Sequence, residues 1–192
     1  MGDDRRRPRP PQLSAGSRSL AGTRPRSDRI ARLATRPGSL MAIYVVRHAK
    51  AGDRADWAGD DRLRPLTKPG RRQAEELANW LRKEPIDAIL SSEYVRCIQT
   101  VEPLANQHKL PIEPRKDLEE GSGGESLLRM VSEFKGRNAV LCTHGDLVEE
   151  FLEHLIQKGV VSRSQAKMEK GSTWAVEETA GKITGARYVA AP

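Results

Sequence analysis

Three short, uninterrupted apolar segments recur along the chain, and patterns typical of amphipathic helices lie between them. The segments span residues 42–46, 88–90 and 139–142. Strands that are apolar on both faces are typical of a parallel sheet with helices on both sides, and their alternation with helices indicates an α/β fold. We therefore predict a three-layer α/β/α domain with a mostly parallel sheet. In such sheets, ligands bind beyond the carboxyl ends of the strands.

The helices can be placed from their apolar periodicity. Residues 67–82 form a predicted helix, because apolar residues recur there at i, i+3, i+4 and i+7, with Thr67 as its N-cap and Pro85 beyond its end. A second helix is predicted from Tyr94, with a break or restart at Pro103. The remaining predicted elements are a loop over 111–124, a helix over 125–134, a helix with its apolar stripe over 147–156 that ends at Gly159, and two late strands over 173–176 and 187–190.

The basic character of the chain comes entirely from residues 1–40. This segment holds ten of the 33 cations and three of the 26 acids, so its net charge of +7 equals that of the whole chain. Its Arg- and Pro-rich composition predicts a disordered tail, either a transit-peptide-like or a non-native extension, with the domain itself spanning residues 41–192. We expect nucleic acid to be a partner only through the tail, if at all.

Two further observations bear on the cellular setting. No segment reaches the roughly 18 consecutive apolar residues of a membrane span, so no membrane partner is expected. Cys97 and Cys142 both lie in apolar surroundings, which favours reduced, buried thiols and a cytoplasmic location.

Polar residues follow each apolar segment at the point where its strand should end. Arg47 and His48 follow the first, Arg96 lies shortly after the second, and His144 follows the third, directly before Gly145 at a helix start. Two guanidinium groups buried together cost several kcal/mol unless an anion pairs with them. Because arginine binds phosphate through two parallel hydrogen bonds, and helix N-termini also favour anions, we predict a phosphate site at this edge of the sheet.

These residue types also predict a reaction. A neutral imidazole is a competent nucleophile toward phosphorus, and the other cations can hold the remaining phosphoryl oxygens. A leaving oxygen needs a proton, for which Glu119 and Glu120 are both candidate donors before a Gly-rich bend. We expect neither a metal nor another cofactor, because the four histidines lack metal-ligand spacing.

The chain resembles the histidine phosphatase superfamily, whose fold is phosphoglycerate-mutase-like. Within it, the short chain and the RPLT sequence resemble SixA-type phosphohistidine phosphatases, and DDxxRPL, VRCxQTxEPLA and KGSTW also resemble the second domain of some actinobacterial MutT-type hydrolases. The motifs that carry the resemblance are VVRHAKA at 45–51, RPLTKPGRRQAEELANWL at 64–81, SSEYVRCIQT at 91–100, LEEGSGGES at 118–126 and VLCTHGD at 140–146.

The resemblance implies a role for each candidate. His48 would be the nucleophile that becomes phosphorylated, and Arg47, Arg96 and His144 would bind the phosphoryl group. Glu120 fits the family's acid better than Glu119, because the family pattern is Leu-x-Glu and Leu118 sets the register. Ala49 stands where the family often has glycine.

The expected activity is metal-independent hydrolysis of a phosphomonoester or a phosphohistidine, and the partner is a phosphorylated small molecule or a phosphohistidine protein. A phosphomutase and a non-catalytic phosphate-binding module remain alternatives. Only 24 residues separate Arg96 from Glu120, which leaves little room for the lid that a mutase needs. We expect Arg62 and Arg64 to be solvated, and Ser92 to serve a local turn.

Overall fold

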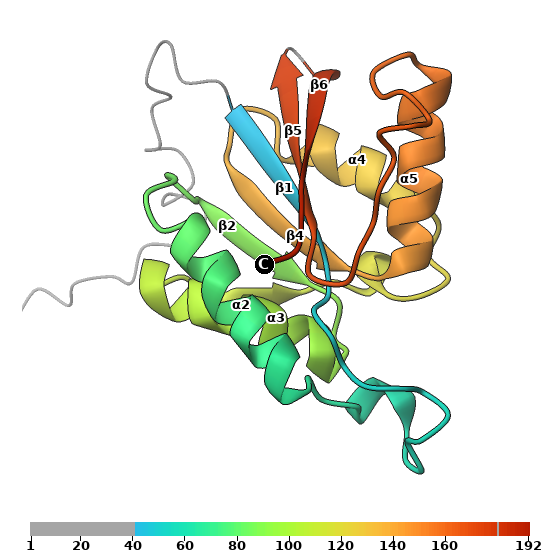
Figure 1. Cartoon of the computed structure of the whole chain (residues 1–192). Coiled ribbons are helices and arrows are strands. Elements are labelled where there is room, and N and C mark those ends of the chain that lie inside the picture. Colours follow the sequence, from blue (N-terminus) through green and yellow to red (C-terminus); the bar gives the residue numbers. More distant parts are fainter. Residues whose placement is uncertain (1–40, 180) are drawn as a thin grey trace, which may run out of the picture. The chain divides into compact units, whose positions relative to one another are not determined.

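The computed structural model describes residues 41–179 and 181–192, so the tail predicted over residues 1–40 lies outside the described residues. Strands, helices and short 3-10 turns alternate along this part of the chain (Figure 1). The elements are β1 (Met41–Arg47), η1 (Asp61–Leu63), α2 (Lys68–Trp80), β2 (Ala88–Ser91), α3 (Val95–His108), β3 (Ile112–Pro114), η2 (Lys116–Leu118), α4 (Glu125–Glu133), β4 (Ala139–Thr143), α5 (Gly145–Gln157), β5 (Thr173–Thr179) and β6 (Lys182–Val189).

All six strands form one mixed sheet in the order β3-β2-β4-β1-β5-β6. The first four in this order pair in parallel, whereas β5 is antiparallel to β1 and to β6. The register places Arg47 opposite Thr143, and Ser91 opposite Cys142. The three apolar strands therefore end at the same edge of the sheet, as the sequence predicted.

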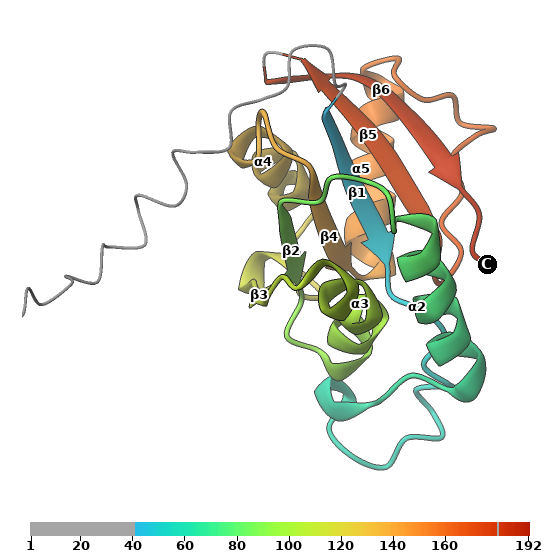
Figure 2. The same ribbon diagram turned by 90° about the vertical axis from the view of Figure 1, so that its left-hand side faces the viewer.

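Helices cover both faces of the sheet, with α2 and α3 on one face and α4 and α5 on the other (Figures 1 and 2). Successive residues of each strand point to opposite faces. Thus Ile43 and Val45 pack in the core beside α4 and α5, whereas Tyr44 and Val46 pack in the core beside α2 and α3. This double burial is why the central strands are continuously apolar, and the predicted three-layer α/β/α class is confirmed.

The predicted elements are present, with three differences. The last strand, expected over 187–190, is β6 and begins already at Lys182, because it pairs along the whole length of β5. The helix from Tyr94 does not break at Pro103, since α3 runs continuously to His108. Proline has no N–H to donate to the carbonyl four residues earlier, but Val101 and Leu104 are fully buried on either side of it and hold the helix in place. The segment expected to be loop contains β3, an edge strand of three residues that is too short to show a pattern.

The amino end of α2 packs directly on the chain that leaves β1. Thr67 caps the helix by accepting a hydrogen bond from the Gly70 N–H, as predicted, and its own N–H and hydroxyl donate to the Lys50 carbonyl at 2.9 and 3.0 Å. A Cβ on Gly70 would lie 2.0 Å from that carbonyl oxygen, so only glycine fits there. This packing fixes the segment that follows His48.

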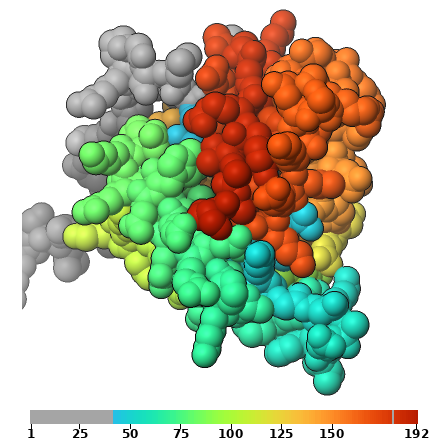
Figure 3. Space-filling view, viewed as in Figure 1, coloured from blue at the N-terminus to red at the C-terminus, as the bar shows by residue number. Residues whose placement is uncertain are grey.

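The loop between β1 and α2 forms a lobe at one end of the molecule, drawn in cyan at the lower right of the space-filling view (Figure 3). Within the described part of the chain, no helix has the length and apolar character needed to cross a membrane.

Candidate active site

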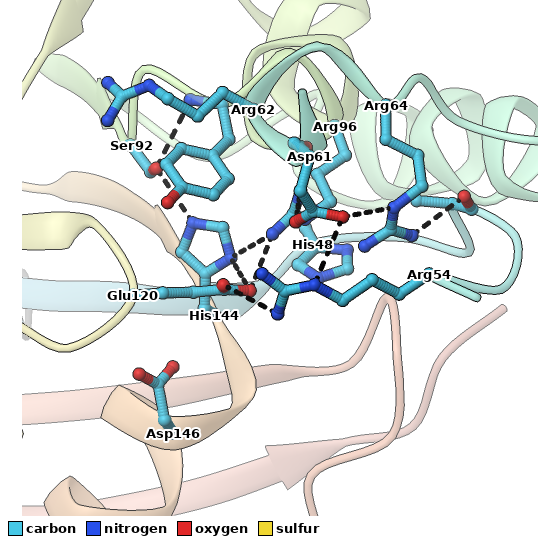
Figure 4. Close-up of polar contacts among 12 residues, drawn as sticks. His48, Arg54, Asp61, Arg62, Arg64, Ser92, Arg96, Glu120, His144 and Asp146 are labelled. Atoms are coloured by element: carbon cyan, nitrogen blue, oxygen red, sulfur yellow. Dashed lines mark hydrogen bonds and ion pairs between the residues drawn. The ribbon is translucent and has the colours of Figure 1, made fainter. Parts of the chain in front are cut away.

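The structure brings the predicted site residues together at the carboxyl edge of the sheet (Figure 4). The rings of His48 and His144 are 5.4 Å apart between centroids, and Arg96 Nη2 is 3.3 Å from His144 Nδ1. Arg96 is fully buried, and the two histidines are 5% and 1% exposed. His48 and His144 directly follow β1 and β4, and Arg96 lies on α3, so the sheet register described above is what assembles them.

His48 is held as a neutral imidazole. Its Nδ1 lies 2.8 Å from the Ala49 carbonyl oxygen, which can only accept a hydrogen bond, so Nδ1 carries the proton and Nε2 keeps its lone pair. The pKa of His48 is lowered to about 3, mainly by burial; the hydrogen bond to Ala49 opposes this shift, and the positive charges of Arg96, Arg47 and Lys170 contribute to it. The ring is therefore in its nucleophilic form throughout the neutral pH range.

His144 is oriented from both ring nitrogens. Arg96 donates to Nδ1, so Nε2 carries the proton and donates to Ser92 Oγ at 2.8 Å. Burial lowers the pKa of His144 to about 2, with smaller contributions from His48 and Arg96. Ser92 also accepts from the Tyr94 N–H, so the predicted local role is present, but the contact with His144 was missed.

Arg96 links the histidines to two carboxylates. Its Nη1 donates to the Asp61 carbonyl at 2.8 Å and lies 3.0 Å from Asp61 Oδ2, while its Nη2 donates to Glu120 Oε1 at 2.6 Å. The guanidinium carbon lies 4.6 Å from the centre of the Tyr94 ring. A fully buried cation needs such partners to offset its desolvation.

The two adjacent glutamates point to different places. Glu120 reaches the site, with Oε1 only 3.2 Å from His144 Nδ1. Glu119 instead makes a two-armed ion pair with Arg62 at 2.8 and 2.9 Å, and Arg62 also contacts Glu93. The geometry thus favours Glu120 over Glu119 as the proton donor, in agreement with the Leu-x-Glu register.

Arg47 lies beneath the start of α5. Its Nη1 donates to the Met168 carbonyl, and a Cβ on Gly145 would lie 2.8 Å from its Nη2. Burial lowers the pKa of Arg47, while Asp146 and Glu149 oppose this shift. The glycine at the start of α5 therefore leaves room for a guanidinium beside the backbone, in addition to exposing N–H groups.

Sequence reasoning missed Asp61 and Arg54, and it misjudged Arg64. Asp61 Oδ1 accepts from Arg64 Nε at 2.8 Å, and this bond is the main reason that the pKa of Asp61 lies below its usual value. Arg64 is 7% exposed rather than solvated, and it also donates to the carbonyls of Ala51 and Gly52. One signal in the sequence could have pointed to Asp61. Arg96 was expected to be buried, and a buried guanidinium needs acceptors on both of its arms, so a partner besides Glu120 was to be sought.

Arg54 closes this network at its exposed side. Its Nε lies 3.6 Å from Asp61 Oδ1 and its Nη1 lies 3.6 Å from Glu120 Oε2.

Within residues 41–179 and 181–192, no group of three or more His, Cys, Asp or Glu side chains is arranged to hold a metal ion.

Acidification is expected to destabilise the fold through these two histidines. The unfolded chain binds protons near the usual histidine pKa of about 6.5, whereas the folded chain keeps both rings neutral to well below pH 5. Stability is therefore lost as pH falls below about 6.5, by up to about 2 kcal/mol per histidine at pH 5. Urea unfolding at pH 7 and pH 5 measures the free energy of unfolding. Its decrease between the two pH values should be smaller for His48→Asn and for His144→Asn than for the wild type. An equal decrease would contradict the lowered pKa of these histidines.

Comparison with known proteins agrees with this geometry. Residues 43–127 match the family described as histidine phosphatase superfamily, branch 1. The chain is 34% identical over 166 residues to the 8-oxo-(d)GTP phosphatase of Mycolicibacterium smegmatis, covering 84% of this chain and 52% of that protein. It is 31% identical over 124 residues to phosphohistidine phosphatase SixA of Escherichia coli, covering 64% of this chain and 63% of that protein. The chain thus spans between half and two thirds of these relatives.

Solved structures share the fold. A protein of Agrobacterium tumefaciens described as phosphohistidine phosphatase SixA superposes with a TM-score of 0.66 at 21% identity, covering 79% of this chain and 99% of that one. A tungstate complex of the protein histidine phosphatase SixA superposes with a TM-score of 0.61 at 22% identity, covering 78% and 94%. At these identities the likeness establishes the architecture.

Proposed function

We propose that the chain belongs to the histidine phosphatase superfamily, whose model matches residues 43–127, and that it hydrolyses a phosphomonoester or a phosphohistidine through a phosphorylated His48. The observation that carries this proposal is the state of His48: it is buried, it is neutral, and its unprotonated Nε2 lies beside a group of cations. Such an imidazole can attack phosphorus, and the cations attract the dianion that it attacks.

In the first step, His48 Nε2 forms a bond to phosphorus as the bond from phosphorus to the leaving group breaks. Nδ1 keeps its proton and its hydrogen bond to the Ala49 carbonyl, which stabilises the positive charge that develops on the ring. Arg47 and Arg96 hold the non-bridging oxygens, and His144, whose Nδ1 accepts from Arg96, orients that guanidinium. No metal is required in this scheme.

Glu120 supplies the proton that the leaving group takes. Its Oε1 and His144 Nδ1 lie 3.2 Å apart, and a proton on either atom turns this contact into a hydrogen bond. A phosphate dianion near Arg96 competes with Glu120 for Nη2, which frees the carboxyl to face the leaving group. In the second step, Glu120 takes a proton from water as the water oxygen attacks phosphorus, which releases inorganic phosphate and free His48.

The site supports hydrolysis more than a mutase reaction. The described chain between Arg96 and Glu120 contains the rest of α3, the three-residue β3 and the three-residue η2, which together form no lid over the site. A non-catalytic phosphate-binding module remains the alternative from another class.

Two substrate classes follow from the relatives. SixA points to a phosphohistidine, and the mycobacterial enzyme points to a nucleotide. The site admits both, since each presents a phosphoryl group to His48. A cytoplasmic location is part of this proposal, supported by the two free, buried cysteines.

The test is turnover of p-nitrophenyl phosphate by the full chain in excess EDTA, together with trapping of the phosphorylated protein by rapid denaturation. We expect turnover that EDTA does not reduce and a phosphate label that is stable in base but lost in acid, as a phosphorus–nitrogen bond requires. Phosphate binding without turnover on any phosphohistidine, sugar phosphate or nucleotide would favour the binding module. A label that survives acid would exclude the histidine intermediate.

A further inference from the structure

A second group of cations lies beside the phosphoryl site and takes no part in the mechanism above. It lines a hollow of about 530 Å³ that begins two residues after His48. Four lining residues are cationic, and Asp53 is the one carboxylate among them. The lining residues are Lys50, Ala51, Gly52, Asp53, Arg54, Arg64, Thr67 and Lys170.

A single buried side-chain amide links the backbones of the two lysines of this hollow. Gln73 on α2 is 7% exposed; its Oε1 accepts from the Lys50 N–H at 3.1 Å, and its Nε2 donates to the Lys170 carbonyl at 3.2 Å. The Gly171 N–H in turn donates to the carbonyls of Arg47 and His48, both at 3.1 Å. The backbones that carry the two ammonium groups are thus fixed to each other and to the nucleophile.

The hollow adjoins the phosphoryl site at two points. Arg54 lines the hollow and also lies 3.6 Å from Glu120, so its guanidinium belongs to both places (Figure 4). Lys170 is close enough to His48 that its charge contributes to the lowered pKa of that histidine. An anion in the hollow would therefore lie next to a phosphoryl group at His48.

The charges in the hollow are not balanced locally. Arg64 is committed to Asp61 and to backbone carbonyls. Within residues 41–179 and 181–192, neither Lys50 nor Lys170 forms an ion pair, and both side chains are exposed. Cations of one sign held together raise the local potential, which favours a bound anion.

We infer that this hollow is a second anion subsite, and that the physiological substrate carries a second phosphate close to the one that His48 attacks. The inference rests on the proposed function for the identity of the first site. Two sources share this chemistry: a compound whose phosphates are joined through an anhydride oxygen, such as a nucleoside diphosphate or triphosphate, and a compound that bears two separate phosphate esters. A lone phosphohistidine on a neutral protein surface would leave the subsite unused.

The test is calorimetric titration of the full chain, in EDTA, with three phosphonates that the site cannot hydrolyse. Methylphosphonate carries one anionic group, methylenediphosphonate mimics joined phosphates, and propane-1,3-diphosphonate mimics separated ones. We expect at least one diphosphonate to bind about tenfold more tightly than methylphosphonate, because it gains charge-assisted hydrogen bonds to the lysines. The tighter of the two identifies the source.

Variants assign the preference to the hollow. The measured quantity is the dissociation constant of methylphosphonate divided by that of the tighter diphosphonate. The double variant Lys50→Gln/Lys170→Gln should reduce this ratio to within about twofold, and each single variant should reduce it in part. Lys83→Gln, which lies just beyond the opposite end of α2 and removes one charge as each single variant does, should retain the wild-type ratio. Diphosphonates that bind no more tightly than methylphosphonate, or a double variant that keeps the preference, would overturn the inference.

Turnover of p-nitrophenyl phosphate in the same preparations separates this inference from the proposed function. Turnover without a diphosphonate preference would leave the phosphatase standing and remove the subsite. A preference that depends on the lysines in a protein without turnover would leave the subsite standing and remove the phosphatase.

Discussion

His48→Ala is expected to lower kcat for p-nitrophenyl phosphate by about 10³-fold or more, because it removes the proposed nucleophile. The residual rate would come from water attacking a phosphoryl group that Arg47 and Arg96 still bind. Initial rates of phosphate release in excess EDTA measure the effect. The acid-labile label on the denatured protein should disappear in the same variant.

His154→Ala provides the matched control for this experiment. His154 lies on α5, outside the site, and its replacement removes an imidazole of the same kind. We expect this variant to keep the wild-type rate and the label. Equal turnover in His48→Ala and the wild type would show that another group is the nucleophile.

Arg96→Gln is expected to lower kcat/KM by about 10²–10³-fold, since it removes a buried cation that we propose holds the phosphoryl group. The same change leaves Glu120 and Asp61 facing each other across the space that Nη1 and Nη2 occupied, so Glu120 also loses the contact that positions it. Arg96→Lys keeps the charge without the two-armed geometry, so its kcat/KM should lie between those of the wild type and of Arg96→Gln. Rates over a range of substrate concentrations measure these effects, and unfolding temperatures show whether each variant is folded.

Arg163→Gln is the control for the arginine substitution. Arg163 also forms an ion pair, with Glu153 at 2.9 Å, but both side chains are exposed on the surface. Loss of such a pair changes stability by less than about 1 kcal/mol and should leave kcat/KM unchanged. An Arg96→Gln variant that behaves like Arg163→Gln would place the phosphoryl group elsewhere.

The sequence predicted the fold and the central residues of the site because both follow from short-range patterns. Continuous apolar strands can only be buried on both faces, and His48 and His144 directly follow the strands that align at one edge. The register of the parallel strands then brings them together. The predicted role of each residue stays a prediction until the variants are measured.

The parts that the sequence could not supply depend on long-range contacts. Asp61 lies in a 3-10 turn of an irregular loop, and its place beside Arg96 depends on a contact across 35 residues. Arg64 looks like a surface arginine in the sequence, but three acceptors around it allow its burial. Choosing Glu120 over Glu119 from geometry required the position of Arg62, which no local pattern gives.

The central place of β1 in the sheet has a consequence for the synthesis of this protein. β1 ends at Arg47, but its partners β4 and β5 lie at residues 139–143 and 173–179. At about 5–20 residues per second, a ribosome needs roughly 5–20 s after Arg47 to reach the end of β4. During this time β1 has neither neighbour, so its apolar side chains stay unpaired in the nascent chain, and His48, Arg96 and His144 should come together only late in synthesis.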